Sequence, residues 1–235
     1  MDLSEQELEK YDRHFLIDGF SEVQQKKLRK AKMLVIGAGG LGSPVLLYLA
    51  AAGAGTIGIV ENDQVALSNL PRQILFSHRD VGLSKADLAG SVILEKNPDC
   101  HVLLYRQRWN EYDAEKIASD FDMIIDCTDN FQSRLLSDKT SRKLDIPFIY
   151  GAVYQMEGQV SVFNYRNSRS YADFLSRQEM SSEDSRQGIL GPAAGVVGNL
   201  QAAEAIKIIT GIGEVLAGKM LFFSLRYNRF QLLNL

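Results

Sequence analysis

The stretch MLVIGAGGLG (33–42) decides the fold of this chain. Its apolar half ends in glycines, which is typical of a buried strand that leads into a tight turn. The segment that follows, Leu41 to Ala52, has no helix breaker beyond Pro44 and is closed by Gly53. Proline in a first turn and glycine after a last turn are typical of a helix. The stretch therefore predicts a strand, a glycine turn and a helix in succession.

Apolar runs and helix-prone segments alternate after this unit. We expect strands at 33–37, 56–60, 101–107, 123–127 and 147–151, and helices at 41–52, 84–96, 111–120 and 130–143. Strands that alternate with helices favour a parallel sheet with helical crossovers. Residues 152–156 and 159–165 instead predict an antiparallel hairpin that turns at Glu157-Gly158, and 220–225 and 230–235 predict two final strands. The expected fold is α/β: a Rossmann-like, mostly parallel sheet with helices on both faces, extended by antiparallel strands in the C-terminal third.

Two segments near the C-terminus have a different character. Residues 166–187 are polar and rich in serine, which indicates a loop. Residues 195–210 predict an amphipathic helix. Its apolar face carries Val196, Leu200, Ala203, Ile206 and Ile209, and its polar face carries Gln201, Glu204 and Lys207.

Composition indicates which kinds of partner the chain can bind and in which cellular compartment it works. The net charge of −3 is spread along the chain, which argues against a nucleic-acid groove or an anionic membrane as partner. The N-terminus is acidic and unlike a signal peptide. Residues 33–60 carry no charge, but their glycines fall at two breaks, which favours strands and a helix over a membrane span. Two cysteines allow neither a disulfide framework nor a four-cysteine zinc site. We expect a soluble, cytoplasmic protein.

The glycine turn predicts a nucleotide site. Its glycines match the pattern GxGxxG between a strand and a helix, where backbone approaches a phosphate and the helix offers free N–H groups. They are Gly37, Gly39, Gly40 and Gly42. Glu61 ends the second strand and can accept a hydrogen bond from a ribose hydroxyl. The pattern alone leaves NAD, FAD and ATP open.

The residues after Glu61 favour a polyphosphate. The segment SNLPRQ (68–73) concentrates polar groups suited to phosphate oxygens, and Lys85 adds a point charge from the next helix. Strand 123–127 ends in DCTDN (126–130), whose carboxylates point into the ligand crevice of a parallel sheet. An acidic side chain beside a polyphosphate suggests a magnesium ligand.

Six motifs in order identify a resemblance. RHFLIDGF, GAGGLGSP, SNLPRQ, GLSKA, DCTDN and MEGQVSVF, followed by GPAAGVVGNLQAAEAIK (191–207), resemble the ThiF/MoeB/HesA family, the bacterial relatives of ubiquitin-activating enzymes. The resemblance implies that the chain uses ATP and Mg²⁺ to convert the C-terminal carboxylate of a small ubiquitin-fold carrier ending in Gly-Gly into an acyl-adenylate. It implies a nucleotide-binding part at about 30–150 and a carrier-binding part at about 151–235 of a single domain, 1–235.

The resemblance also implies residue roles. Backbone at Gly40 contacts the nucleotide, and Glu61 holds the ribose. Phosphate contacts fall to Ser68, Asn69, Arg72, Gln73 and Lys85. Asp129 binds the magnesium ion with Asn130 nearby, and Arg13 reaches the site of a partner subunit across a homodimer. Arg72, Lys85, Asp129 and Arg13 are thus the expected catalytic residues.

The chain departs from many relatives in its cysteines. The two CxxC pairs that bind structural zinc are absent, so zinc is not expected. No cysteine follows Cys127, which we expect to be a small buried thiol, so the loop cysteine that some relatives use is absent. Whether sulfur transfer occurs in this site or on another protein stays open at this point. Four alternatives remain open: the same ATP chemistry on a peptide, the same chemistry on a tRNA base, an NAD-dependent oxidoreductase that shares only GxGxxG and Glu61, or a non-catalytic binding subunit. The presence of Arg72, Lys85 and Asp129 argues against the last.

Overall fold

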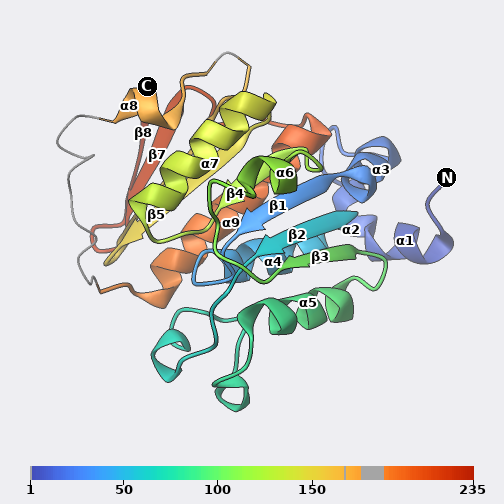
Figure 1. Ribbon diagram of the computed structural model, residues 1–235. Coiled ribbons are helices and arrows are strands. Elements are labelled where there is room, and N and C mark those ends of the chain that lie inside the picture. The colour runs from blue at the N-terminus through green and yellow to red at the C-terminus, as the bar shows by residue number, and fades with distance from the viewer. Residues whose placement is uncertain (1, 167, 176–187) are drawn as a thin grey trace.

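The computed structural model describes residues 2–166, 168–175 and 188–235 (Figure 1). Within these residues eight strands form one sheet in the order β3-β2-β1-β4-β5-β6-β7-β8. The strands are β1 (Lys32–Ile36), β2 (Thr56–Val60), β3 (His101–Tyr105), β4 (Met123–Asp126), β5 (Phe148–Tyr154), β6 (Glu157–Phe163), β7 (Lys219–Ser224) and β8 (Arg229–Asn234). Strands β1 to β5 pair in parallel, and β5 to β8 pair antiparallel. The predicted fold class is confirmed.

Helices cover both faces of the sheet (Figure 1). One layer contains α3 (Glu22–Lys30), α4 (Gly42–Ala51), α5 (Lys85–Lys96) and α9 (Gly191–Thr210), and the opposite layer contains α6 (Ala114–Ala118), α7 (Phe131–Leu144) and α8 (Tyr171–Phe174). Successive side chains of a strand point to opposite faces. Accordingly, Met33 and Val35 of β1 pack in the core beneath α4 and α9, and Leu34 and Ile36 pack in the core on the other face. Burial on both faces explains why β1 is apolar from Met33 to Ile36.

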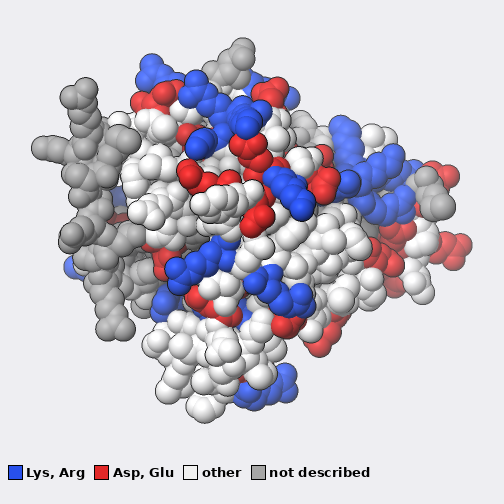
Figure 2. All heavy atoms as spheres, in the orientation of Figure 1, with Lys and Arg blue, Asp and Glu red and all other residues white. Residues whose placement is uncertain are grey.

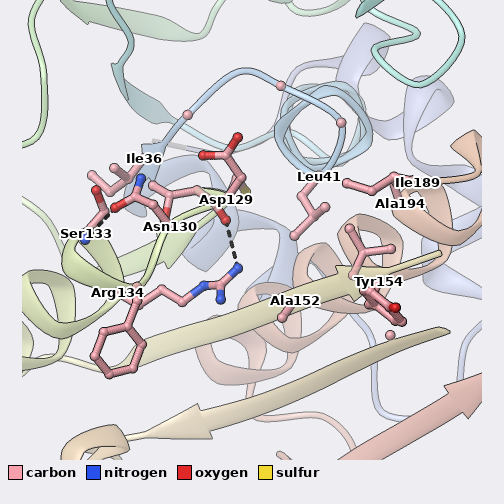
Figure 3. Close-up of a pocket in the computed structure, with 18 of the residues that line it drawn as sticks. Ile36, Leu41, Asp129, Asn130, Ser133, Arg134, Ala152, Tyr154, Ile189 and Ala194 are labelled. Carbon is pink, nitrogen blue, oxygen red and sulfur yellow. Dashed lines mark hydrogen bonds between the residues drawn. The ribbon is translucent and has the colours of Figure 1, made fainter. Parts of the chain in front are cut away.

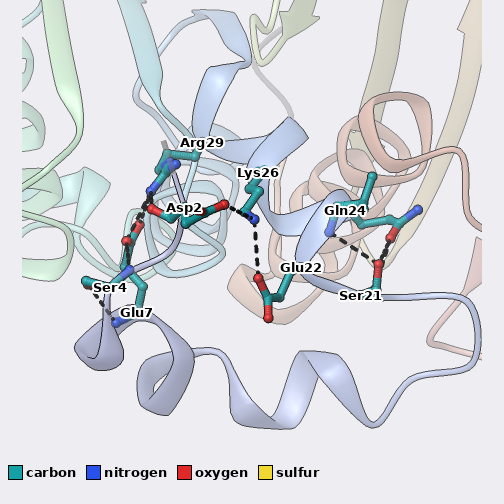
Figure 4. Close-up of polar contacts among 9 residues, drawn as sticks. Asp2, Ser4, Glu7, Ser21, Glu22, Gln24, Lys26 and Arg29 are labelled. Carbon is teal, nitrogen blue, oxygen red and sulfur yellow. Dashed lines mark hydrogen bonds and ion pairs between the residues drawn. The ribbon is translucent and has the colours of Figure 1, made fainter.

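The short helices α1 (Glu5–Lys10) and α2 (Asp12–Phe15) precede α3 at the N-terminus. Capping boxes start α1 at Ser4 and α3 at Ser21. Ion pairs then join the two segments, with Arg29 3.1 Å from Glu7 and Lys26 2.8 Å from Asp2 (Figure 4). These contacts hold the N-terminal helices beside α3.

The hairpin differs from the sequence prediction. A strand ending at Gly151 and a second strand from 152 were expected, but β5 runs unbroken from Phe148 to Tyr154 and pairs with both β4 and β6. The chain turns at Gln155, where φ is 53°, and Gly158 lies inside β6. A Cβ on Gly158 would lie 2.5 Å from Val197 of α9. That glycine therefore serves packing and not a turn.

The amphipathic pattern of α9 was also misread. Gln201 and Glu204, expected on a polar face, are 0% and 2% exposed, whereas Ala203 is exposed. The Gln201 amide donates to the carbonyl of Asp126 at 2.6 Å, and the Glu204 carboxylate accepts from the backbone of Leu216 at 2.8 Å. Buried polar groups need such partners, and sequence periodicity does not reveal them.

The expected loop at 166–187 lies partly outside the described residues. Its described part contains the short helix α8, which the serine-rich composition did not predict. Asp138 of α7 anchors α8 by accepting hydrogen bonds from the backbone of Tyr171 and Ala172, at 2.9 and 3.1 Å. Of the helices in the described segments, none is long and apolar enough to cross a membrane.

Charges are mixed on the molecular surface. Figure 2 shows lysine and arginine side chains interspersed with aspartate and glutamate over the visible face. This distribution agrees with the small net charge of −3 and provides no broad basic surface on that face.

Candidate functional site

An open cavity of about 2380 Å³ lies at the carboxyl ends of the parallel strands. The chain leaves β1 toward β2 and β3 on one side, then crosses to β4 on the other, and ligands bind where the strand order reverses in this way. The cavity continues along the antiparallel strands. Lining residues from that part include Ala152, Tyr154, Gln159, Phe222, Arg229 and Leu233.

The glycine turn forms one wall of the cavity. Gly37, Gly39 and Gly40 line it, and Gly37 has a φ of 94°, in the left-handed region that favours glycine. Gly42 is not among the lining residues of the described chain. A Cβ on Gly42 would lie 2.1 Å from the Gly37 carbonyl oxygen. The fourth glycine therefore permits the close approach of α4 to the turn, and it does not face a ligand.

Glu61 is held by three backbone N–H groups. Its Oε1 accepts from Asn62 and Asp63 at 2.7 and 2.8 Å, and its Oε2 accepts from Ala38 in the glycine turn at 3.0 Å. The side chain is 9% exposed and lines the cavity. Glu61 thus fixes the turn to the end of β2, while Oε2 keeps a lone pair for a further donor.

The SNLPRQ segment folds into a short 3-10 helix, η1 (Leu67–Asn69), followed by a turn. Arg72 donates to the carbonyl of Ser68 at 2.9 Å, and Asn69 accepts from the backbone of Ala66 at 3.0 Å. Arg72, Asn69 and the buried Gln73 line the cavity. Within the described residues the Ser68 side chain is exposed and outside the lining, so its carbonyl supports Arg72 and its hydroxyl has no demonstrated part.

Lys85 enters the cavity from the first residue of α5. Its side chain is 5% exposed, and its ammonium lies 3.1 Å from the Asp63 carboxylate. The neighbouring Ser84 caps the helix by accepting from the backbone of Asp87 at 3.3 Å. The sequence therefore placed Lys85 correctly at the cavity but missed Asp63.

The end of β4 carries two carboxylates with different surroundings. Asp126 is fully buried, accepts from the Thr128 hydroxyl at 2.8 Å and lies 3.6 Å from Arg134. Burial raises the pKa of Asp126 to about 6, although the positive charge of Arg134 lowers it. Asp129, in contrast, is exposed and lines the cavity, and Asn130 caps α7 by accepting from the backbone of Ser133 at 2.9 Å (Figure 3).

Besides Asp63, the lining residues that were not singled out from the sequence include Arg134 and Trp109. Arg134 projects between the loop that carries Asp129 and the strand that carries Ala152, and it donates to the Thr128 carbonyl at 3.2 Å (Figure 3). Its position four residues after the cap of α7 places it one turn along the same helix face, which is a signal the sequence contained. Trp109, the only tryptophan, lies in the loop after β3. A lone tryptophan in a loop carries no comparable signal.

Sequence comparison identifies the family. The model of the ThiF family matches residues 11–235. The chain belongs to the ThiF family. The resemblance drawn from the six motifs is confirmed.

Named relatives of this ThiF-family chain are longer proteins. It is 45% identical over 223 residues to a probable molybdopterin-synthase adenylyltransferase of Porphyra purpurea, covering 93% of this chain and 58% of the relative. It is 41% identical to a probable adenylyltransferase/sulfurtransferase MoeZ of Mycobacterium tuberculosis, covering 94% of this chain and 58% of the relative. The chain thus spans less than two thirds of the length of these curated relatives.

Solved structures share the fold of the ThiF-family chain. PaaA superposes with a TM-score of 0.84 at 26% identity, covering 99% of this chain and 74% of that one. A structure of Escherichia coli MccB with AMPCPP and MccA superposes with a TM-score of 0.85 at 25% identity, covering 96% of this chain and 71% of that one.

Of the four expected catalytic residues, Arg72, Lys85 and Asp129 line the cavity of the described chain, and Arg13 lies apart from it. It is on α2, its side chain is 88% exposed, and among the described residues it is not part of the cavity lining. A role for Arg13 in catalysis therefore requires a second copy of the chain.

The departures from other ThiF-family sequences concern metal and thiol chemistry. Across residues 2–166, 168–175 and 188–235, no three His, Cys, Asp or Glu side chains are grouped closely enough to hold a metal ion by themselves. Cys127 is 7% exposed, and burial raises the pKa of its thiol well above the ordinary value. A buried neutral thiol is a poor nucleophile, which agrees with the structural role expected for Cys127.

Proposed function

We propose that this chain is an ATP-dependent adenylyltransferase acting on the C-terminal carboxylate of a small ubiquitin-like sulfur carrier, of the ThiS/MoaD type, in the cytoplasm. One observation carries the proposal: a single cavity joins Arg72, Lys85 and Asp129 to the face of the antiparallel strands. Such a cavity can hold a nucleotide at one end and an extended chain terminus at the other. The adenylyltransferases among the relatives support the same chemistry.

The residues present fit ATP with magnesium. The backbone of Gly37, Gly39 and Gly40 offers the close approach that phosphates need, and Glu61 retains an acceptor for a ribose hydroxyl. Asp129, an exposed carboxylate in the lining, fits Mg²⁺, which usually keeps waters and substrate phosphates as its other ligands. When bound, the ion would neutralise phosphate charge.

The proposed reaction joins two anions. A carrier carboxylate oxygen forms a bond to the α-phosphorus of ATP, and the bond from that phosphorus to the pyrophosphate oxygen breaks. Arg72 and Lys85 offset the charge that grows on the phosphate oxygens and on the leaving group. Because the attacking carboxylate is already ionised at neutral pH, the reaction needs no general base from the protein.

The antiparallel part, about 151–235, is the proposed contact for the carrier, and its Gly-Gly end is proposed to enter the cavity. A Gly-Gly end suits the part of the cavity near Asp129, because glycine has no side chain and can lie close to the backbone of the cavity wall. Arg13 is proposed to complete the site from a second copy in a homodimer. Sulfur delivery is assigned to another protein because Cys127 is buried.

The test is ATP–pyrophosphate exchange with a panel of carriers that end in Gly-Gly. We expect exchange with one carrier, reduced at least about 100-fold by Arg72→Ala and by Asp129→Ala, the scale of losing one group that stabilises a transition-state charge. Arg79→Ala is the matched control, because Arg79 is 92% exposed and outside the lining residues of the described chain. Exchange that persists in both site variants would contradict the proposed site. Tight binding of NAD without binding of ATP would favour an oxidoreductase instead.

A further inference from the structure

The contact between Lys85 and Asp63 is unusual for a site that receives an anion. An acidic side chain beside a phosphate-binding lysine repels the ligand, yet Asp63 lines the same cavity and contacts the Lys85 ammonium at 3.1 Å. The backbone makes a second connection, because the N–H of Lys85 donates to the Asp63 carbonyl at 3.0 Å. Asp63 therefore holds both ends of this residue.

Lys85 has two physical reasons to need a partner before any nucleotide binds. Its side chain is 5% exposed, so the ammonium has lost much of its contact with water. It is also the first residue of the 12-residue helix α5, where the positive end of the helix dipole disfavours a cation. A carboxylate at hydrogen-bond distance offsets both effects.

Asp63 is itself fixed in place. Its N–H donates to Glu61 at 2.8 Å, and its segment joins the start of α5 through a bridge between Gln64 and Ser84. The N–H of Val65 also donates to the Leu83 carbonyl at 2.9 Å. The end of β2 and the start of α5 thus form one hydrogen-bonded clip.

We propose that Asp63 is a positioning residue, which keeps the Lys85 ammonium aimed into the cavity so that an arriving polyphosphate meets a cation that is already in place. This inference rests on the proposed function. The side chain of Asp63 is 61% exposed, so water screens its repulsion of a phosphate, while the buried Lys85 benefits fully from the contact. Positioning therefore outweighs repulsion.

The first experiment needs no turnover. We expect acetic anhydride to acetylate Lys85 of the nucleotide-free protein about fivefold faster in Asp63→Ala than in the wild type, with Asp63→Asn in between, because the amide keeps an acceptor but not the charge. Peptide mass spectrometry measures the rate. Lys139, which is 69% exposed and pairs with Glu111, is the internal control. Equal rates at Lys85 in all three proteins would overturn the proposal.

The second experiment separates positioning from repulsion. By calorimetric titration with ATP and Mg²⁺, Asp63→Ala should weaken binding about fivefold in the wild-type background and less than about twofold in the Lys85→Ala background, since a positioning residue acts through its partner. Asp63→Glu, which restores the charge, should recover part of the affinity. Tighter binding by Asp63→Ala would show that Asp63 only repels the nucleotide and would overturn the proposal.

A matched control variant is available on α5. Asp87→Asn removes an aspartate of α5 whose partner, Arg106, lies 2.5 Å away and outside the cavity lining of the described residues. This variant should change neither readout. Melting temperatures near that of the wild type would exclude general unfolding of the variants. Failure of the wild type to bind ATP would instead reject the proposed function, which is a different result from unchanged binding in Asp63→Ala.

Discussion

The two halves of the sheet use their side chains in opposite ways. At the parallel half, polar side chains beside the cavity are bound to backbone: Glu61 accepts from three N–H groups, and Asn130 caps a helix. At the antiparallel half, every residue of the outermost strand β8 is exposed. Leu233 and Phe230 of that strand are 40% and 63% exposed.

The difference shows that the side chains of the parallel half are held in position before a ligand binds, whereas those of β8 are not. A site whose groups are already held loses little entropy when a ligand binds, and the same groups can bind a small molecule with high selectivity. An exposed strand offers area and an unpaired edge, which suit a macromolecular partner. We therefore expect changes in the parallel half to have larger effects than changes in β8.

The largest effect is expected in the glycine turn. Gly42→Ala would place a Cβ 2.1 Å from the Gly37 carbonyl oxygen, so α4 must move away from the turn. We expect the free energy of unfolding to fall by about 3 kcal/mol and ATP binding to be lost, measured by urea unfolding and calorimetry. Gly195→Ala in α9 is the control, because its Cβ would meet open space, and it should be neutral or stabilising by about 1 kcal/mol. Equal free energies of unfolding for Gly42→Ala and Gly195→Ala would contradict the tight packing inferred at Gly42.

A smaller effect is expected from the buried carboxylate at the end of β4. Burial raises the pKa of Asp126 from 3.8 to about 6, so the folded protein holds this proton more tightly than the unfolded chain. The stabilising contribution is complete below about pH 4 and is lost as the pH rises through 6. Relative to Asp126→Asn, the wild type should therefore lose about 2 kcal/mol of unfolding free energy between pH 4 and pH 7. A difference that does not change with pH in urea titrations would contradict this pKa.

The smallest effect is expected in β8, where neighbours differ in the face they occupy. Leu233 lines the cavity, whereas Leu232, 52% exposed, points to the other face of the strand. Leu233→Ser should raise the KM for the carrier in the exchange assay about fivefold, the scale of losing one apolar contact, and should leave ATP binding unchanged. Leu232→Ser should change neither constant. An effect of Leu232→Ser as large as that of Leu233→Ser would move the proposed carrier contact away from the cavity.

Local motif spacing in the sequence was enough to locate many of the residues that line the cavity. The glycine turn and Asp129 were expected at the ends of strands, Arg72 in the segment after Glu61 and Lys85 on the next helix. Arg72, Lys85, Asp129 and three of the four glycines line one cavity. Sequence reasoning failed where a polar residue has a distant partner. Gln201 was placed in solvent, but its amide reaches the Asp126 carbonyl 75 positions away in sequence.

The sequence by itself determined the succession of the main strands and helices, the family, and the residue types around the glycine turn. These properties follow from local periodicity and motif spacing, which operate over a few residues. Only the tertiary structure decided that Asp63 contacts Lys85 and that the Gln201 amide bonds the carbonyl of Asp126. Each depends on a contact between segments that the chain brings together only when the sheet forms, and no local pattern records such a contact.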